Sequence, residues 1–169
     1  YEKIARQTKP LSYDSPILLE LIRICCNEKA RFVQADEREI SSDGGGRALL
    51  NLGHTFAHAI EAVAGYGDYL HGEAVSIGLL CALRLSKSQG FCMEDPESML
   101  VDILSSYGLP TALKHSLSIS TLMEKMRSDK KVSRGKLRFV MMKEIGDAFV
   151  EEISEVCKIE EVWASVGAT

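Results

Sequence analysis

The sequence predicts a mainly α-helical fold with one short β-hairpin near residues 137–150, and three observations lead to it. Apolar residues recur at helical spacing along most of the 169-residue chain, which is long enough for one domain with a sizeable core. Around Gly146 and Asp147, β-branched and aromatic residues instead flank a turn-forming pair, which is typical of a hairpin. Strands and helices do not alternate, and neither GxGxxG nor a Walker loop occurs, which excludes a Rossmann half.

The first helix is expected over residues 15–37. Ser15 is a suitable cap and Pro16 suits the first helical position. The apolar positions that follow repeat at helical spacing, namely Ile17, Leu18, Leu21, Ile24 and Cys25. A loop is then expected around residues 41–46, where two serines and an aspartate precede three glycines.

The remaining elements follow from the same patterns. Residues 47–64 read as one helix, which the glycines at 65 and 67 end. Residues 72–90 are apolar on almost every face, so we expect a central, buried helix there. Further helices are expected over residues 95–108, 118–131 and 154–166, with the hairpin between the last two.

Composition excludes several classes of function. Apolar residues make up 46% of the chain and charged residues 26%, and the formal net charge is −4, so no nucleic-acid partner is indicated. The apolar runs are too short to span a bilayer and no signal peptide opens the chain, so we expect a cytoplasmic protein without a membrane partner. Five cysteines without a CxxC pair are interpreted as small buried hydrophobes in a reducing compartment.

Histidines form the most informative pattern. His54 and His58 are four residues apart and share one helix face, on which Arg47 and Asn51 would lie as well. A cation, an amide and two imidazoles are poor core material, because each would need a buried partner. His71 follows the glycine-rich turn, so a second, antiparallel helix would return it to the side of the first.

Two histidines from two elements plus one carboxylate form the ligand set of catalytic zinc, with one coordination position left open. Spacing alone leaves five carboxylates as candidates for the third ligand, namely Asp36, Glu37, Glu39, Asp68 and Glu73. The alternative is that the histidines are structural, because an HxxxH pair also arises by chance.

A cluster of cations lies far along the chain, in Lys130, Lys131, Arg134, Lys136 and Arg138. Such a run usually forms a solvated face. Ammonium groups directly before a turn also suit a phosphate or carboxylate ligand, as does Lys29 if it faces the histidines.

Three blocks, in order, resemble the 3-dehydroquinate synthases: "KARFVQADERE" (29–39), "RALLNLGHTFAHAIEAVAGYGDYLHGEAV" (47–75) and "DKKVSRGKLRFVMMKEIG" (129–146). The resemblance implies a lyase of the shikimate pathway and of aromatic amino-acid biosynthesis. It would convert 3-deoxy-D-arabino-heptulosonate 7-phosphate (DAHP) to 3-dehydroquinate and phosphate. The implied cofactors are NAD⁺ and a divalent metal, Zn²⁺ or Co²⁺. The chemistry would combine a transient oxidation, loss of phosphate, re-reduction and an aldol ring closure.

The resemblance also implies roles for individual residues. His54 and His71 would bind the metal, and His58 would bind substrate and transfer protons near the phosphate. The other catalytic and substrate-binding residues would be Lys29, Arg47 and Asn51, with Lys130 or Lys131 at the phosphate. The third metal ligand would be a glutamate preceding all the matched blocks, so none of the five local carboxylates would serve. Residues 40–46 join the first two blocks and form a longer connection than the family has. Because this connection leads directly into Arg47, it affects where Arg47 lies.

Domain organisation follows from the same resemblance. Residues 1–169 would form a single metal- and substrate-binding C-terminal domain, whose partner is an N-terminal NAD-binding α/β domain. The chain begins at Tyr1 rather than methionine, so we expect it to have been cut from something longer and to be inactive alone. Alternatives are another sugar-phosphate cyclase, a metal-dependent polyol dehydrogenase of the same architecture, or a non-catalytic helical module. A homodimer also remains open.

Overall fold

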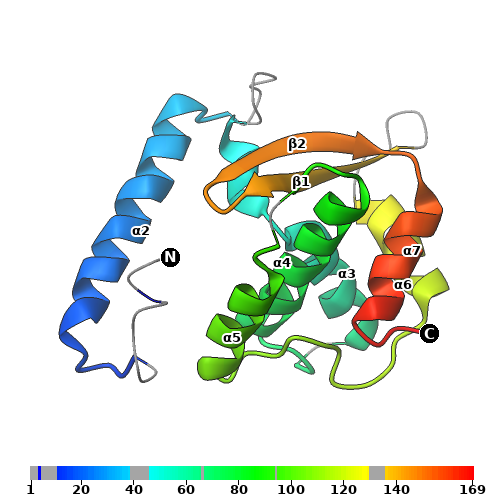
Figure 1. The fold of residues 1–169 in the computed structure, drawn as a ribbon, viewed down its shortest axis with the longest axis horizontal. Coiled ribbons are helices and arrows are strands. Elements are labelled where there is room, and N and C mark those ends of the chain that lie inside the picture. Colours follow the sequence, from blue (N-terminus) through cyan, green and yellow to red (C-terminus); the bar gives the residue numbers. More distant parts are fainter. Residues whose placement is uncertain (1–3, 5–10, 39–45, 66, 94, 130–135) are drawn as a thin grey trace.

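The computed structural model describes residues 4, 11–38, 46–65, 67–93, 95–129 and 136–169. These form a helical body with one two-stranded antiparallel sheet (Figure 1), which confirms the predicted fold class. The elements, in chain order, are α2 (Pro16–Ala35), the 3₁₀ helix η1 (Gly46–Asn51), α3 (His54–Ala64), α4 (His71–Ser88), α5 (Glu97–Ser106), α6 (Ile119–Asp129), β1 (Leu137–Glu144), β2 (Asp147–Ile153) and α7 (Val156–Ser165). None of the helices in these ranges is long and apolar enough to cross a membrane.

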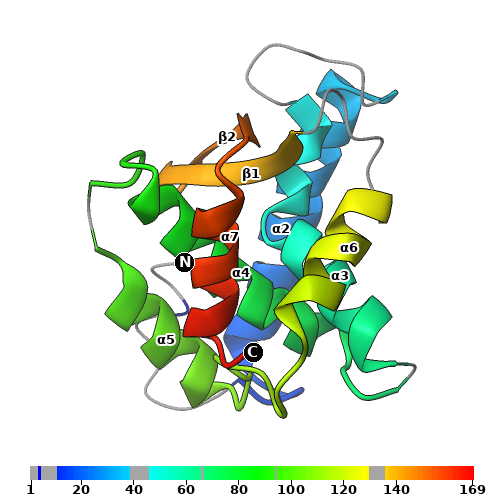
Figure 2. The same cartoon turned by 90° about the vertical axis from the view of Figure 1, so that its right-hand side faces the viewer.

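Helix α4 occupies the centre of the body, as predicted from its apolar faces. It packs against α3, α5, α7 and β1, and α6 lies beside α3 (Figure 2). Trp163 of α7 is fully buried, and its ring lies 5.1 Å from that of Phe56 on α3. Phe56 in turn lies 5.3 Å from Phe139 of β1, so one aromatic cluster joins α3, α7 and the sheet.

The predicted hairpin is confirmed. Strands β1 and β2 pair antiparallel with Val140 opposite Val150, and Gly146 closes the turn with φ of 98°. The sheet is joined to α4 through Ser86, which is completely buried. Its hydroxyl donates to the Ala82 carbonyl (2.7 Å) and accepts from the Met142 backbone N–H (2.9 Å), so neither polar group is buried without a partner.

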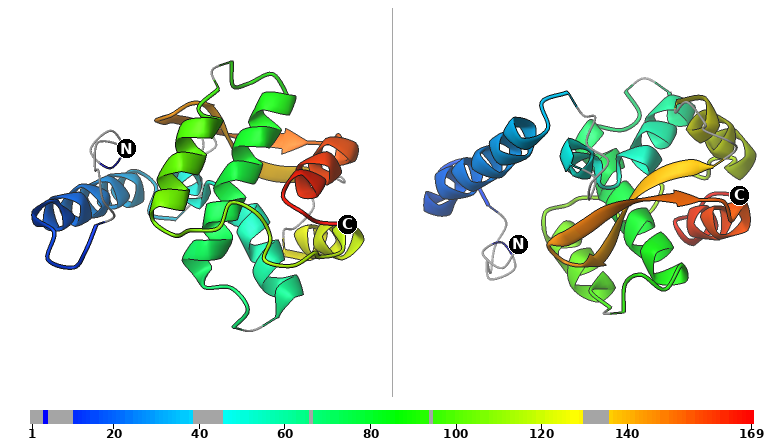
Figure 3. Two further views of the ribbon diagram at one scale, coloured as in Figure 1. Left: turned by 60° about the horizontal axis from the view of Figure 1, so that its bottom comes forward. Right: turned by 90° about the horizontal axis from the view of Figure 1, so that it is seen from above.

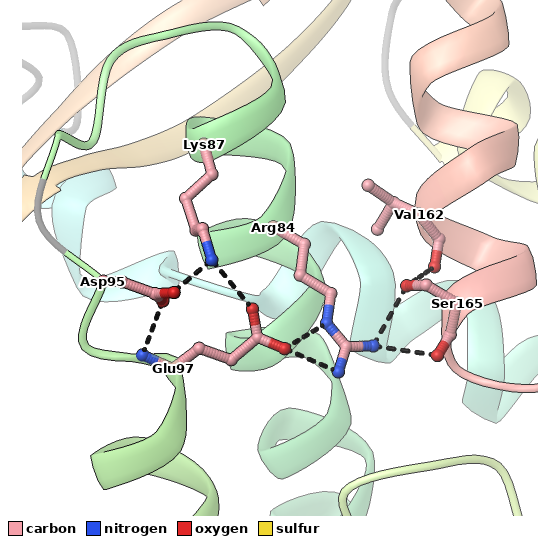
Figure 4. A network of polar contacts seen from close by, with 6 residues as sticks. All are labelled: Arg84, Lys87, Asp95, Glu97, Val162 and Ser165. Carbon is pink, nitrogen blue, oxygen red and sulfur yellow. Dashed lines mark hydrogen bonds and ion pairs between the residues drawn. The ribbon is translucent and has the colours of Figure 1, made fainter.

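An ion-pair network fastens α4 to α5 and α7 (Figure 4). Arg84 Nε donates to Glu97 Oε1 (2.9 Å), and Arg84 Nη1 donates to the Ser165 carbonyl (2.9 Å). Lys87 Nζ donates to Asp95 Oδ1 (2.8 Å) and Glu97 Oε2 (3.2 Å). The Asp95 bond, the larger cause, and the Glu97 carboxylate both raise the pKa of Lys87. The cations of α4 thereby fix the start of α5 and the end of α7.

Helix α2 stands apart from the body (Figures 1 and 3). The predicted helix is present, yet none of its residues is buried. Leu19 is 77% exposed and Ile22 is 50% exposed. Just past its C-terminal end, the Asp36 carboxylate accepts the Arg47 backbone N–H (3.2 Å). This connection brings α2 next to η1.

The prediction of one continuous helix over residues 47–64 is wrong. The chain forms η1, then a turn, and α3 begins only at His54. Gly53 interrupts the helix because its φ of 78° is left-handed, outside the α region of an ordinary helix. Arg47 and Asn51 therefore do not share a helix face with His54 and His58.

The interpretation of the cysteines is only partly correct. Cys81 and Cys92 are buried, and burial raises the pKa of the Cys81 thiol to about 12. Cys25, Cys26 and Cys157 are exposed. The first two lie on α2, whose apolar stripe misled the prediction because none of the residues of this helix is buried.

Candidate metal and substrate site

Three histidines meet where α3 lies beside the start of α4. The ring centroids of His54 and His71 are 5.3 Å apart, those of His54 and His58 5.7 Å, and those of His58 and His71 6.5 Å. His54 is the first residue of α3, His58 follows one turn later, and His71 is the first residue of α4. The predicted return of His71 to the side of the first helix is confirmed.

The ring nitrogens of two of these histidines are oriented by acceptors. His54 Nδ1 lies 3.2 Å from the Leu52 carbonyl oxygen, and His71 Nδ1 lies 3.1 Å from Glu61 Oε1. A carbonyl and a carboxylate only accept, so each Nδ1 carries the proton and a neutral ring keeps its lone pair on Nε2. A neutral imidazole with a free Nε2 is the form that binds a divalent metal, so this pair fits one. Within the described ranges, no group of three or more His, Cys, Asp or Glu side chains is arranged to hold a metal.

A cationic hollow of about 490 Å³ opens beside His54. It lies between α2, η1 and α3, and its lining residues are Cys25, Glu28, Lys29, Arg47, Leu50, Asn51 and His54. Arg47 is held there by two contacts with the end of α2, because its Nη1 also donates to the Glu37 carbonyl (3.0 Å). The predicted residues Lys29, Arg47, Asn51 and His54 thus surround one space, although they come from three elements.

His58 lines a second hollow, of about 280 Å³, between α3 and α6. Lys125 and Ser128 of α6 line it as well. Sequence reasoning missed Lys125, although its position shortly before the lysine pair at 130–131 was a usable signal. Lys130 and Lys131, the predicted phosphate ligands, lie outside the described residues, as do Arg134 and the link at 40–45.

Comparison with known proteins assigns the family. A model of the family described as 3-dehydroquinate synthase C-terminal matches residues 1–132. The chain belongs to this family. The resemblance seen in the three sequence blocks is therefore confirmed.

Curated relatives agree with this family. The chain is 46% identical over 160 residues to the 3-dehydroquinate synthase of Opitutus terrae, covering 95% of this chain and 44% of the relative. It is 43% identical over 140 residues to the 3-dehydroquinate synthase of Pseudoalteromonas atlantica, which covers 83% of this chain and 38% of that relative. The chain thus spans less than half of the length of these relatives.

Solved structures share the fold. The 2-deoxy-scyllo-inosose synthase complexed with carbaglucose-6-phosphate, NAD⁺ and Co²⁺ superposes with a TM-score of 0.76 at 20% identity, over 95% of this chain and 48% of that one. The 2-epi-5-epi-valiolone synthase from Streptomyces hygroscopicus, with NAD⁺ and Zn²⁺ bound, superposes with a TM-score of 0.71 at 20% identity. This match covers 88% of this chain and 39% of that one. The expected dehydroquinate synthase-like fold is confirmed.

Three of the five carboxylates proposed from spacing have other partners in this family member. Asp36 binds the Arg47 N–H, and Asp68 Oδ2 lies 3.6 Å from Nε2 of His115. Glu73 accepts from the Leu70 backbone N–H (2.8 Å) and from Lys114 Nζ (2.7 Å). Glu37 offers its backbone carbonyl to Arg47, and Glu39 lies outside the described residues. Among the described residues, Glu61 is a carboxylate that approaches this histidine cluster, and spacing did not single it out.

Glu73 caps α4 and so helps to hold His71 at its first turn, and this contact should depend on pH. The Lys114 hydrogen bond, and secondly the Leu70 N–H, lower the pKa of Glu73 from 4.5. The stabilisation is therefore complete above pH 4.5 and disappears as the pH falls through the lowered folded-state value. At pH 7 we expect a higher melting temperature for wild type than for Glu73→Gln. The difference between the two melting temperatures should become smaller as the pH falls. Thermal melts from pH 7 to pH 3 check this, and a pH-independent difference would contradict it.

Proposed function

We propose that this chain is the metal- and substrate-binding domain of a 3-dehydroquinate synthase, which converts DAHP to 3-dehydroquinate and phosphate. The observation that carries the proposal is a pair of histidines, His54 and His71, whose ring centroids lie 5.3 Å apart, with His54 also lining a hollow that contains Lys29 and Arg47. Such a site suits an anionic, oxygen-rich substrate held next to a metal ion. The family assignment and the identity to curated 3-dehydroquinate synthases support DAHP as the substrate.

The metal ligands proposed on this chain are His54 and His71, each through Nε2. A bound Zn²⁺ or Co²⁺ would supply Lewis-acid polarisation of substrate hydroxyl and carbonyl oxygens. The third ligand is proposed to be a glutamate from a segment that this chain does not contain. The backbone carbonyl of Leu52 and the carboxylate of Glu61 keep the two imidazoles in the ligating tautomer.

Substrate oxygens are proposed to bind Lys29, Arg47 and Asn51 in the larger hollow. The Arg47 guanidinium is already held by the Glu37 carbonyl, which lowers the side-chain entropy lost when a substrate binds. His58 is proposed to hold and move a proton near the phosphate, in the hollow that it shares with Lys125. Lys130 or Lys131 would complete the phosphate site.

An N-terminal NAD-binding domain is the proposed partner. The Opitutus terrae relative is more than twice as long as its matched part, since the match covers 44% of it. NAD⁺ bound there would accept and return the hydride, so the 169-residue chain alone is proposed to be inactive.

Another sugar-phosphate cyclase is the second candidate, because the solved structures with this fold include 2-deoxy-scyllo-inosose synthase. Phosphate release by the gene's complete product, supplied with NAD⁺ and Zn²⁺, separates the two. We expect release from DAHP and none from glucose 6-phosphate. Release from glucose 6-phosphate alone would favour the second candidate. NADH formation with a polyol, without phosphate, would indicate a dehydrogenase, and no turnover by folded protein would indicate a non-catalytic module.

A further inference from the structure

We propose that Glu61 is the positioning residue for His71, which it holds in the Nδ1–H tautomer so that Nε2 faces the metal position. The inference rests on the proposed function, because it assigns His71 as a ligand. Glu61 is a positioning residue rather than a ligand, since it acts on the metal only through the imidazole.

Helix geometry places Glu61 correctly for this role. On α3 it follows His58 by three residues and His54 by seven, so all three side chains project from one face. His71 reaches the same face from the start of α4, and its Nδ1 lies 3.1 Å from Glu61 Oε1. The ring centroids of His71 and His54 are 5.3 Å apart, so a single ion between them can be reached by both.

The two proposed ligands are oriented by different means. His54 is the first residue of α3 and half-buried, and it bonds to a backbone carbonyl that no side-chain substitution removes. The side chain of His71 is 59% exposed, and its ring contacts the Glu61 carboxylate, itself 32% exposed. Without an acceptor at Nδ1, an exposed imidazole is free to rotate and to place its proton on Nε2, which removes the lone pair needed for a metal.

The simpler interpretation is a surface ion pair that contributes little to anything. The two interpretations predict different effects of the substitution Glu61→Gln on His71. The amide oxygen of Glu61→Gln still accepts from Nδ1–H but carries no charge, so positioning survives while an ion pair does not.

The experiment records the tautomer of His71 and the affinity for Co²⁺ in the 169-residue chain. Long-range ¹H–¹⁵N spectra at about pH 8, where imidazole is neutral, report the tautomer, and the His71→Ala spectrum assigns the signal. We expect Nδ1–H in wild type, a shift toward Nε2–H in Glu61→Ala, and Nδ1–H again in Glu61→Gln. We expect Glu61→Ala to weaken Co²⁺ binding about 10- to 100-fold, with most affinity restored by glutamine. Glu160→Ala, the same change at an exposed site on α7, should alter neither readout.

An unchanged His71 tautomer in Glu61→Ala would overturn the inference, whether or not Co²⁺ binds, because the tautomer is read without metal. Failure of the proposed function has a different signature. If His54→Ala and His71→Ala leave Co²⁺ binding intact, the metal site is wrong. If they abolish it and Glu61→Ala matches wild type in both readouts, only the role of Glu61 is wrong.

Discussion

Gly78→Ala is expected to lower the free energy of unfolding by about 3 kcal/mol or more, at the upper end for an overpacked core. A Cβ atom at residue 78 would lie 2.2 Å from the Gly53 carbonyl oxygen and 3.1 Å from its carbon. Both are backbone atoms, so no side chain can swing away to make room. Relief would require α4 to move off the start of α3, where His54 begins.

Gly72→Ala is the matched control, because Gly72 belongs to the same helix and a Cβ there meets nothing within 4 Å. We expect its stability to stay near wild type or to rise by about 0.5 kcal/mol, since alanine costs less chain entropy than glycine. Urea denaturation of the three proteins gives the free energies. Equal values for Gly78→Ala and Gly72→Ala would show that the Gly53–Gly78 contact does not constrain the helix pair.

Helical periodicity predicted α4 correctly but predicted the region before α3 incorrectly, and the Gly53–Gly78 contact explains the error. Periodicity detects which residues face the core, and the leucines at 49, 50 and 52 suit a 3₁₀ turn as well as an α-helix. The break depends on Gly53 meeting a residue 25 positions later, which is a property of tertiary packing. Arg47 and Asn51 still reach the site, although from η1 rather than along one helix face.

The candidate site was predictable to the extent that it depends on local geometry. A helix, a turn and an antiparallel helix bring His71 to His54 in any such hairpin, and Glu61 could have been found by extending the His54–His58 stripe by one more turn. The approach of α2 to η1 was not predictable. It depends on Asp36 and Glu37 bonding to Arg47 across a link that periodicity does not register.

His54→Ala and His71→Ala are each expected to weaken Zn²⁺ binding by more than about 100-fold. This loss is larger than the one expected for removing Glu61, which only orients a ligand. This chain is proposed to supply two nitrogen ligands, so either change leaves a single imidazole. Such a site cannot hold an ion more firmly than any surface histidine. Isothermal titration of the chain with Zn²⁺ measures the loss.

Variants of the two other histidines show whether a loss of Zn²⁺ affinity is specific to His54 and His71. His115 lies outside the cluster, near Tyr69, with 6.3 Å between the ring centroids, so His115→Ala should bind Zn²⁺ like wild type. His58→Ala tests the division of roles within the cluster. His58 lines the hollow shared with Lys125, and its proposed work is on the substrate, so its removal should spare Zn²⁺ affinity. If His58→Ala weakens binding as much as His54→Ala does, then the three histidines bind the ion together. If none of the four variants differs from wild type, the cluster is not a metal site.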